Sequence, residues 1–346
     1  MKAVLLVGGE GTRLRPLTYT MPKALMPIGN VPFLERQLGW LASHGVDEVI
    51  LSMGYLAEPF RAHFPDGRFG DVKLRYAVEE SPLGTAGGIR FAADGIRERF
   101  VVCNGDVLTT LDLSAMLEFH ADRQAQASIY LCQVEDPSAF GVVPTRGDGE
   151  VIGFIEKPPR DQAPTNWINA GVYVLEPEVL DRIPPRINVS IERETFPRMV
   201  ESRRQLFGFH WPGYWLDIGS PAKYLQANLD VLAGAIPGAA GAVAASATID
   251  GDVANSVIGP DVVVAAGAVV RNSVLHAGAR VEAGARVVDS VVGAGAVIGA
   301  AASVGDITIV GDGVRVGADA RVVAGRLAPA HVGAVGASGE QPGTAS

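Results

Sequence analysis

The sequence predicts an α/β domain with a mostly parallel sheet, followed by a parallel β-helix. Up to about Leu232, apolar runs typical of strands alternate with stretches typical of helices, and this alternation favours a sheet covered on both faces. From about Ala242 onward Gly, Ala and Val dominate and aromatic residues are absent. We therefore predict a first domain at 1–232, a linker at 233–247, a β-helix at 248–326 and a flexible tail at 327–346.

The elements of the first domain follow from local patterns. The predicted strands are Ala3–Val7, Glu48–Ser52, Leu74–Val78, Phe100–Cys103, Ser128–Gln133, Gly171–Leu175 and Gln205–His210. The predicted helices are Pro32–His44, Leu56–His63, Thr85–Ala93, Ser114–Arg123 and Pro221–Leu232. Ligands of such sheets bind at the carboxyl ends of the strands, so candidate site residues are sought there.

The β-helix is predicted from a six-residue step between branched aliphatic residues, repeated three times per coil. The residues in phase are Ile258, Val264, Val270, Leu275, Val281, Val287, Val292, Ile298, Val304, Val310, Val316 and Val322. A low-complexity Gly/Ala linker would also be rich in these small residues, but it has no reason to keep this phase. Four coils are predicted, with a partial coil around Ile249.

Composition excludes several classes of function. The 346-residue chain has a formal net charge of −9 and a pI of about 5.2, so nucleic-acid binding through a basic face is not expected. No apolar run is long enough for a membrane span. The chain has two cysteines and no C-x-x-C motif, so we expect buried thiols rather than disulfides. A cytoplasmic location is predicted.

A glycine-rich loop follows the first predicted strand. It holds Gly8, Gly9 and Gly11, and Thr12, Arg13 and Lys23 come shortly after. Glycines let backbone N–H groups approach a phosphate closely, and the two cations add positive charge. The loop fits neither the dinucleotide fingerprint nor the Walker A motif. A plain glycine turn is the alternative. We predict that the glycine loop holds a polyphosphate. The prolines that follow are poor helix residues, so we predict an ordered loop between Arg15 and Pro27 that lines the site.

The segment GGEGTRLRPLT…PKALMPIGNVPFLE resembles the opening of the sugar-1-phosphate nucleotidylyltransferases, the nucleoside-diphosphate-sugar pyrophosphorylases. The resemblance implies a Rossmann-like nucleotidyltransferase domain and a left-handed β-helix of hexapeptide repeats. It also implies that the loop and its cations hold the triphosphate of an NTP. By position these residues are Gly8, Gly9, Gly11, Thr12, Arg13 and Lys23.

Two aspartates match the magnesium ligands of that family. Asp106 follows a predicted strand in an Asn-Gly-Asp segment, and Asp217 lies in a W-x-D-x-G segment. Mg²⁺ takes one or two carboxylates together with phosphate oxygens. The alternatives are turn chemistry for Asp106 and turn or helix-cap chemistry for Asp217. The resemblance implies that both aspartates hold Mg²⁺ against the phosphates.

Further motifs match the substrate sites of the family. In Glu156-Lys157-Pro158, Glu156 would accept hydrogen bonds from sugar hydroxyls and Lys157 would neutralise the sugar phosphate. A surface ion pair is the alternative. Asn169, in an N-x-G strand, would contact the sugar. Gly84 and Thr85, in L-G-T-A, would lie against the nucleotide, although Thr85 could instead cap a helix.

The resemblance implies a transfer of nucleoside monophosphate from an NTP to a sugar 1-phosphate, with Arg13, Lys23 and Lys157 as catalytic cations. The motif combination is most similar to the mannose-1-phosphate guanylyltransferases, which implies GTP and mannose 1-phosphate as substrates. Thymidylyl or uridylyl transfer to glucose 1-phosphate is an alternative, and so is a regulatory homologue without turnover. Acetyl transfer by a hexapeptide acyltransferase would need a suitable histidine, and the β-helix offers only His276. A homo-oligomer formed through the β-helix is expected.

Overall fold

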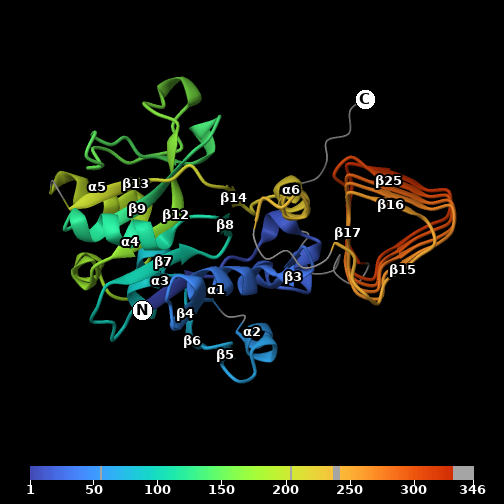
Figure 1. Cartoon of the computed structure of the whole chain (residues 1–346), viewed down its shortest axis with the longest axis horizontal. Helices are drawn as coiled ribbons and strands as arrows, with labels where there is room; N and C mark the ends of the chain where they lie inside the picture. Colours follow the sequence, from blue (N-terminus) through green and yellow to red (C-terminus); the bar gives the residue numbers. More distant parts are fainter. Residues whose placement is uncertain (55–56, 203–204, 237–241, 330–346) are drawn as a thin grey trace. The chain divides into compact units, whose positions relative to one another are not determined.

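The computed structural model describes residues 1–54, 57–202, 205–236 and 242–329 (Figure 1). Their contacts divide the chain into two compact units. Unit 1 consists of Met1–Gly9 and Phe33–Ile218, and unit 2 consists of Glu10–Pro32 and Gly219–Ser346. The loop that follows the glycines thus belongs to the same unit as the C-terminal repeats, a division different from the predicted boundary at 232.

Unit 1 is built on a ten-stranded mixed sheet. Its order is β11-β10-β12-β7-β1-β4-β6-β5, and β9 pairs with both β12 and β13. The strands are β1 Lys2–Leu6, β4 Glu48–Met53, β5 Arg68–Phe69, β6 Val72–Val78, β7 Phe100–Asn104, β9 Ala127–Gln133, β10 Gly141–Val142, β11 Ile155–Glu156, β12 Trp167–Leu175 and β13 Leu206–His210. The central strands β7, β1, β4 and β6 are parallel, which brings their carboxyl ends to one edge of the sheet.

The helices of unit 1 are short. They are α1 Phe33–Ser43, α2 Glu58–His63, α3 Gly84–Ala92, α4 Leu113–Asp122 and α5 Phe196–Glu201. A turn of π-helix, Ile191–Thr195, leads directly into α5. Among the described residues, no helix has both the length and the apolar character needed to cross a bilayer. All the strands and helices predicted for this region are present, with ends shifted by a few residues; the predicted helix start at Leu56 lies outside the described residues.

The sheet of unit 1 encloses an apolar core. Buried residues from β1, β7, β9 and β12 form it, and Ile89 of α3 and Phe196 of α5 pack with them. Cys103 and Cys132 are buried thiols, as predicted. Burial raises the pKa of the Cys132 thiol to about 12, so it stays protonated at neutral pH and is a poor nucleophile.

Unit 2 begins with the loop Glu10–Pro32. The loop contains three short 3-10 turns, Thr12–Leu14, Leu17–Tyr19 and Lys23–Leu25, in agreement with the ordered loop predicted between Arg15 and Pro27. A small hairpin of β2 Pro27–Ile28 and β3 Val31–Pro32 ends it. Gly29 and Asn30 both have positive φ, 56° and 63°, and residues of this type favour such a turn. Helix α6, Pro221–Leu232, also belongs to this unit.

The repeats of unit 2 form three parallel sheets of five strands each, as expected for a left-handed parallel β-helix (Figure 1). One sheet contains β15 Thr248–Ile249, β18 Val263–Val264, β21 Arg280–Val281, β24 Val297–Ile298 and β27 Arg315–Val316. The second contains β16 Asp252–Ala254, β19 Val269–Arg271, β22 Arg286–Val288, β25 Ser303–Gly305 and β28 Arg321–Val323. The third contains β17 Val257–Ile258, β20 Val274–Leu275, β23 Val291–Val292, β26 Ile309–Val310 and β29 Arg326–Leu327.

The predicted phase of the aliphatic residues is confirmed. Ile258 pairs in register with Leu275, and Leu275 pairs with Val292. The twelve residues predicted to be in phase all pack in or against one core inside the β-helix. The partial coil around Ile249 is also present, because Ile249 pairs with Val264. Of the predicted tail, 330–346 lies outside the described residues.

Polar residues stack at one corner of the β-helix. Asn255 and Asn272 have positive φ, and the side-chain amide of Asn255 donates to Asn272 at 2.8 Å. The same corner in the fourth coil is one residue longer. There Asp306 and Ile307 both have positive φ, 56° and 57°, and Ile307 is exposed. The left-handed region is unfavourable for a β-branched residue, so this corner holds strain at the surface.

A buried histidine makes the stability of unit 1 depend on pH. His120 is fully buried, and its ring nitrogens contact Ser128 and Glu176. Burial, followed by the charge of Arg99, lowers its pKa to about 4. Because the unfolded chain binds this proton near pH 6.5, we expect the free energy of unfolding to fall as the pH drops from about 6.5 to about 4. The slope from this group is at most about 1.4 kcal/mol per pH unit.

Urea unfolding at a series of pH values will measure this slope. Protonation of native carboxylates also lowers the free energy of unfolding at acid pH. The informative quantity is therefore the difference in slope between the wild type and His120→Asn. Asparagine keeps a polar group that can contact Ser128. The variant should show a shallower slope between pH 6.5 and pH 4. Equal slopes would mean that His120 is protonated in the folded protein.

Candidate active site

The predicted site residues fall into two groups, one in each compact unit. Unit 1 contains Gly8, Gly9, Gly84, Thr85, Asp106, Glu156, Lys157, Asn169 and Asp217. Unit 2 contains Gly11, Thr12, Arg13 and Lys23. Each group is described by its own contacts.

The two aspartates predicted to bind metal lie on neighbouring segments of unit 1. Strand β8, Val107–Thr109, pairs antiparallel with β14, Trp215–Asp217, and Asp217 is opposite Val107. The backbone N–H of Ile218 donates to the carbonyl of Asp106 at 2.8 Å. Both aspartates are partly buried. Two residues more than a hundred positions apart in the sequence are therefore brought together, as the metal hypothesis requires.

The turn that carries Asp106 is held from several sides. Gly105 donates to the carbonyl of Leu6 at 2.9 Å, and a Cβ at this position would lie 2.5 Å from the same oxygen. Only glycine allows this approach to the end of β1. Buried Gln37 of α1 donates to the carbonyls of Asn104 and Val107 at 3.0 and 3.1 Å. The Asn-Gly-Asp segment is thus a turn, and that turn is fixed beside the start of the glycine loop.

The structure argues against the helix-capping alternatives for Asp217 and Thr85. The side chain of Ser220, not Asp217, accepts from the start of α6, at Lys223 N. Helix α3 begins after Leu83 and has no side-chain cap, so Thr85 is not a capping residue. Trp215 donates from its indole nitrogen to the carbonyl of Ala170 at 2.9 Å, which attaches β14 to the main sheet.

Glu156 lies between two cations. The ammonium of Lys157 is 3.6 Å from Glu156 Oε1, and the guanidinium of Arg193 is 4.0 Å from the same oxygen. Both cationic side chains are more than half exposed, at 57% and 66%, so these pairs add little to stability. Lys157 has a φ of 50° and donates its backbone N–H to Phe140. The surface ion pair is therefore present, and it leaves both cations accessible to an anion. Arg193 was not predicted from the sequence.

A second unpredicted residue, Glu192, links Thr85 to Asn169. The hydroxyl of Thr85 donates to Glu192 Oε2 at 2.7 Å, and the hydroxyl of Tyr173 donates to Oε1 at 3.4 Å. Asn169 donates to the Tyr173 hydroxyl at 2.9 Å. Burial and the negative charge of Glu192 raise the pKa of Tyr173 well above its ordinary value, so this tyrosine is a donor at all working pH values.

Glu192 sits on the π-helical turn that precedes α5. Ser190 caps this turn by accepting from Arg193 N, and its hydroxyl also donates to Glu192 at 2.8 Å. Single π turns occur often at functional sites. The sequence offers one local sign of this arrangement, a Ser followed by several acidic residues at the start of a helix, but that sign does not point to Thr85 or Tyr173.

Replacing Glu192 by alanine should weaken the fold and disturb Asn169, the residue predicted to contact a sugar. Three hydroxyl donors lose their acceptor, and that of Tyr173 is fully buried, so we expect a loss of about 2–3 kcal/mol in the free energy of unfolding. Asn169 is held through Tyr173, so if Asn169 contacts a sugar phosphate as the sequence predicts, the KM for that substrate should rise as well. Urea unfolding and steady-state kinetics measure the two effects. Glu201→Ala, an exposed glutamate at the end of α5, is the control and should change neither.

The glycines of unit 1 differ in how tightly they are packed. Gly84 has a φ of 69°, and a Cβ there would lie 2.6 Å from the carbonyl of Val189. This glycine is therefore required by the packing of α3 against the segment before Glu192. A Cβ on Gly8 would lie 3.2 Å from Gly54 N, whereas a Cβ on Gly9 would meet no atom within 4 Å beyond its chain neighbours. Packing therefore does not require a glycine at position 9.

In unit 2, Gly11 lies against Lys23. Gly11 has a φ of 61°, and a Cβ on it would lie 3.2 Å from Lys23 Cβ and 3.0 Å from the Thr18 methyl. The hydroxyl of Thr18 donates to the carbonyl of Gly11 at 2.8 Å. Thr12 and Arg13 are exposed on the 3-10 turn that follows, and Lys23 is partly buried. The predicted phosphate-binding residues of the loop are therefore close together, with their cations on one compact segment.

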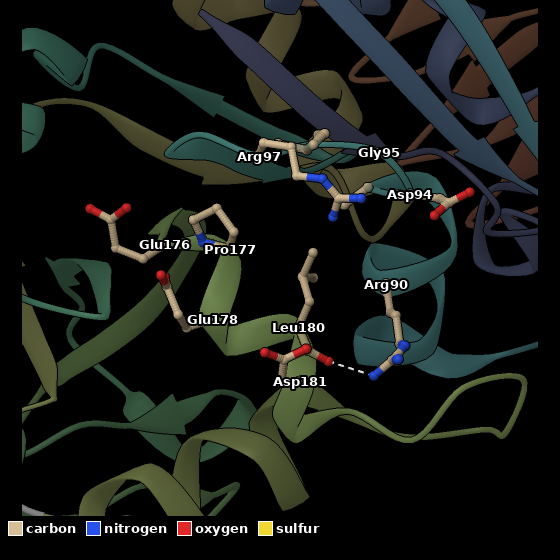
Figure 2. Close-up of a pocket in the computed structure, with 11 residues that line it drawn as sticks. Arg90, Asp94, Gly95, Arg97, Glu176, Pro177, Glu178, Leu180 and Asp181 are labelled. Carbon is tan, nitrogen blue, oxygen red and sulfur yellow. Dashed lines mark hydrogen bonds between the residues drawn. The ribbon is translucent and has the colours of Figure 1, made fainter.

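A separate cavity of about 460 Å³ lies at the end of α3 in unit 1. Figure 2 shows Arg90 and Arg97 on one side of it and Glu176, Glu178 and Asp181 on the other. None of the predicted site residues lines it. Arg90 donates to the carbonyl of Leu180 at 2.6 Å, and also to that of Ile183. This arginine joins α3 to the segment Leu180–Ile183.

Comparison with known proteins identifies the family. The Nucleotidyl transferase family matches residues 2–234, about two thirds of the chain. The chain belongs to the nucleotidyl transferase family. A second match, to the GMPPB C-terminal domain, covers residues 238–332, which includes the β-helix. The resemblance noted for the glycine loop and its following motifs is thereby confirmed.

Curated members of the family include close relatives. The chain is 42% identical over 237 residues to the mannose-1-phosphate guanylyltransferase of Mycobacterium tuberculosis, a match that covers 68% of this chain and 66% of the relative. It is 39% identical over 289 residues to mannose-1-phosphate guanylyltransferase 1 of Arabidopsis thaliana, covering 79% of each. The chain thus spans just under two thirds of the first relative and about four fifths of the second.

Solved structures resemble about two thirds of this nucleotidyl transferase. HddC from Yersinia pseudotuberculosis is 30% identical, with a TM-score of 0.57 over 66% of this chain and 97% of that protein. The same protein has also been crystallised with GMP-PN, with the same identity, TM-score and coverage. A UDP-glucose pyrophosphorylase has a TM-score of 0.60 at 21% identity, over 67% of this chain and 98% of that one, and so supports the fold alone.

Proposed function

We propose that the protein transfers GMP from GTP to mannose 1-phosphate, forming GDP-mannose and releasing pyrophosphate. The observation that carries this proposal is the pairing of β8 with β14, which brings Asp106 and Asp217 together in a chain of the nucleotidyl transferase family. The relatives named mannose-1-phosphate guanylyltransferase support the choice of base and sugar. Thymidylyl or uridylyl transfer to glucose 1-phosphate is the alternative reaction.

The donor set of Asp106 and Asp217 fits a hard divalent cation, for which Mg²⁺ is our choice. Mg²⁺ is held through one or two carboxylates and completes its shell with phosphate oxygens and water. Among the described residues, no group of three or more His, Cys, Asp or Glu side chains could hold a metal. When bound, the ion supplies positive charge to the phosphates of the nucleotide.

We assign the nucleotide to the glycine loop and its cations. In this assignment the backbone N–H groups of Gly9 and Gly11 bind phosphate oxygens, together with Thr12, which follows them in the sequence. Arg13 and Lys23 neutralise the negative charge that develops on the departing pyrophosphate. Gly84 and Thr85, at the start of α3, are assigned to the nucleoside.

We assign the sugar phosphate to Glu156, Lys157 and Asn169. The Glu156 carboxylate accepts from sugar hydroxyls, and Asn169, oriented by Tyr173, contacts the same ring. Lys157, with Arg193 beside it, holds the phosphate that attacks. This phosphate is a dianion and needs no general base, so the protein acts by positioning the reactants and neutralising their charge.

A matrix of nucleotides and sugar phosphates tests the proposal. GTP, dTTP, UTP and ATP are each combined with the 1-phosphates of mannose, glucose and N-acetylglucosamine, with and without Mg²⁺, and released pyrophosphate is measured. We expect the highest kcat/KM for GTP with mannose 1-phosphate. Preference for dTTP or UTP with glucose 1-phosphate would favour the alternative. No release with any pair would identify a regulatory homologue without turnover.

Self-association through the β-helix also remains a prediction. The outer coil at the C-terminal end carries an exposed Val323 beside Arg321, and a strand edge of this kind can pair with another chain. Charged residues oppose such pairing, so the contact would use a face of the β-helix rather than this edge. Sedimentation velocity of the full chain measures the oligomeric state, and a monomer at micromolar concentration would exclude the prediction.

A further inference from the structure

The loop that carries Arg13 and Lys23 is supported by the rest of unit 2, the unit to which it belongs. Between Glu10 and Pro32 the backbone forms only single 3-10 turns and one short hairpin. Such a segment has few backbone hydrogen bonds of its own, and its conformational entropy must be offset by other contacts. Ala24, Leu25 and Met26, directly after Lys23, are buried. The position of Lys23 therefore depends on what holds the hairpin that follows.

Helix α6 holds that hairpin with two residues one turn apart. The hydroxyl of Tyr224 donates to the carbonyl of Pro27 at 2.5 Å. The side-chain oxygen of Asn228 accepts from Gly29 N at 2.9 Å, and its amide donates to the carbonyl of Tyr224. Tyr224 and Asn228 are fully buried, so losing either contact would leave a polar group unsatisfied in the interior.

The β-helix completes this arrangement through His276. Its Nε2 lies 2.9 Å from the Tyr224 hydroxyl. That hydroxyl has one proton, which is donated to Pro27, because a carbonyl can only accept. His276 Nε2 must therefore carry a hydrogen and donate to Tyr224. Burial lowers the pKa of His276 to about 4, so the ring is neutral at working pH and this tautomer is fixed.

Three further contacts join the loop to the coils. Asn30 donates to the carbonyl of Ile258 at 3.0 Å. At the fourth coil the hydroxyl of Thr20 donates to Asp312 Oδ2 at 2.5 Å, and Asp312 Oδ1 accepts from Ala294 N. A Cβ on Gly311 would lie 3.0 Å from the ring of Pro16. Residues of the β-helix thus contact the loop on both sides of Lys23, at Pro16 and Thr20 before it and at Asn30 after it.

We propose that the β-helix is a working part of the nucleotide site, in which His276 and Tyr224 are positioning residues that fix the loop bearing Lys23. The inference rests on the proposed function, because it assigns Lys23 to the phosphates of the nucleotide. It also accounts for the single histidine among the described coils. His276 is buried and serves as a hydrogen-bond donor, so it is not the accessible histidine that acetyl transfer would need.

Paired variants of the full-length protein test the proposal. His276→Leu and Tyr224→Phe each remove one link between the β-helix and Pro27, whereas His276→Gln keeps a donor near the place of Nε2. We expect the first two to raise the KM for the nucleotide on the order of tenfold, as for the loss of a hydrogen bond worth about 1.4 kcal/mol. The KM for the sugar phosphate should change little, and His276→Gln should restore the nucleotide KM.

A destabilised β-helix could by itself impair the enzyme, so Ser290→Ala is the control. Ser290 is fully buried, and its hydroxyl donates to the carbonyl of Val288 within the coils. It should lower the melting temperature without changing the nucleotide KM. Thr20→Val is a second test that should fold normally, since Thr20 is exposed. It should raise the same KM to a smaller extent, while Thr20→Ser should not.

The outcomes separate this proposal from the proposed function. Unchanged nucleotide KM values in His276→Leu, Tyr224→Phe and Thr20→Val, with an active wild type, would overturn the positioning role alone. A wild type that prefers another nucleotide would correct the proposed function, and the variants would then be compared with that nucleotide. For a wild type without turnover, the Kd of Mg·GTP by calorimetry replaces KM, and equal Kd values in wild type and variants would again refute the proposal.

Discussion

Asp217→Asn is expected to reduce turnover on the order of a hundredfold or more while the protein stays folded. The change removes one of the two carboxylates that β8 and β14 bring together, and an amide is a much weaker ligand for Mg²⁺. Loss of one contact to the charge of the transition state typically has an effect of this size. Because a like charge beside Asp106 is removed, the melting temperature without metal should stay the same or rise.

Initial rates over a range of Mg²⁺ concentrations measure the effect. If Asp217 is a ligand, the variant should need more Mg²⁺ for half-maximal rate. Asp122→Asn, at the exposed end of α4, removes the same charge elsewhere in unit 1 and should behave like the wild type. A variant with near-normal turnover and an unchanged Mg²⁺ requirement would contradict the metal assignment.

Lys23→Met is the second substitution for which we expect a loss of about a hundredfold or more in turnover. Lys23 packs against Gly11, where the loop turns with positive φ, and methionine keeps the length and apolar stem of the side chain but has no charge. The negative charge that builds up on pyrophosphate would then lack one of its two cations. The fold should survive, because the ammonium itself is at the end of a side chain that is partly exposed.

Single-turnover rates with saturating nucleotide separate chemistry from binding for this variant. Lys23→Arg should recover part of the rate, since it restores the charge with a different shape. Lys73→Met, on the exposed face of β6, controls for the loss of a cation and should be neutral. Full activity in Lys23→Met would mean that Lys23 has no role in the transfer and that the loop serves another purpose.

The fold was largely predictable because burial leaves a clear pattern in both parts of the sequence. The six-residue step from Ile258 to Val322 gave the stacking of the coils in register, because each aliphatic residue can only be buried above its equivalent. The strands of unit 1 were predictable for a related reason. Central parallel strands are buried on both faces and appear as uninterrupted apolar runs, as in Val101 and Val102 of β7.

The site was predictable only where a motif carries its own chemistry. Asp106 and Asp217 could be named, but their proximity depends on the pairing of β8 with β14, and strands of three residues give no periodic signal. Glu192 was missed for the same reason: its role exists only through Thr85 and Tyr173, which are distant in sequence. The membership of Glu10–Pro32 in unit 2 depends on contacts with α6 and the coils, which no local pattern encodes.

The longer corner at Asp306 and Ile307 has a practical consequence for anyone who wishes to label or tether this protein. The fourth coil accommodates one additional residue there while Val304 and Val310 keep their places in the ladders, and the protruding side chain faces solvent. A short reporter peptide inserted after Ile307 would therefore lengthen a corner that is already longer than its equivalents, so the neighbouring coils need not rearrange.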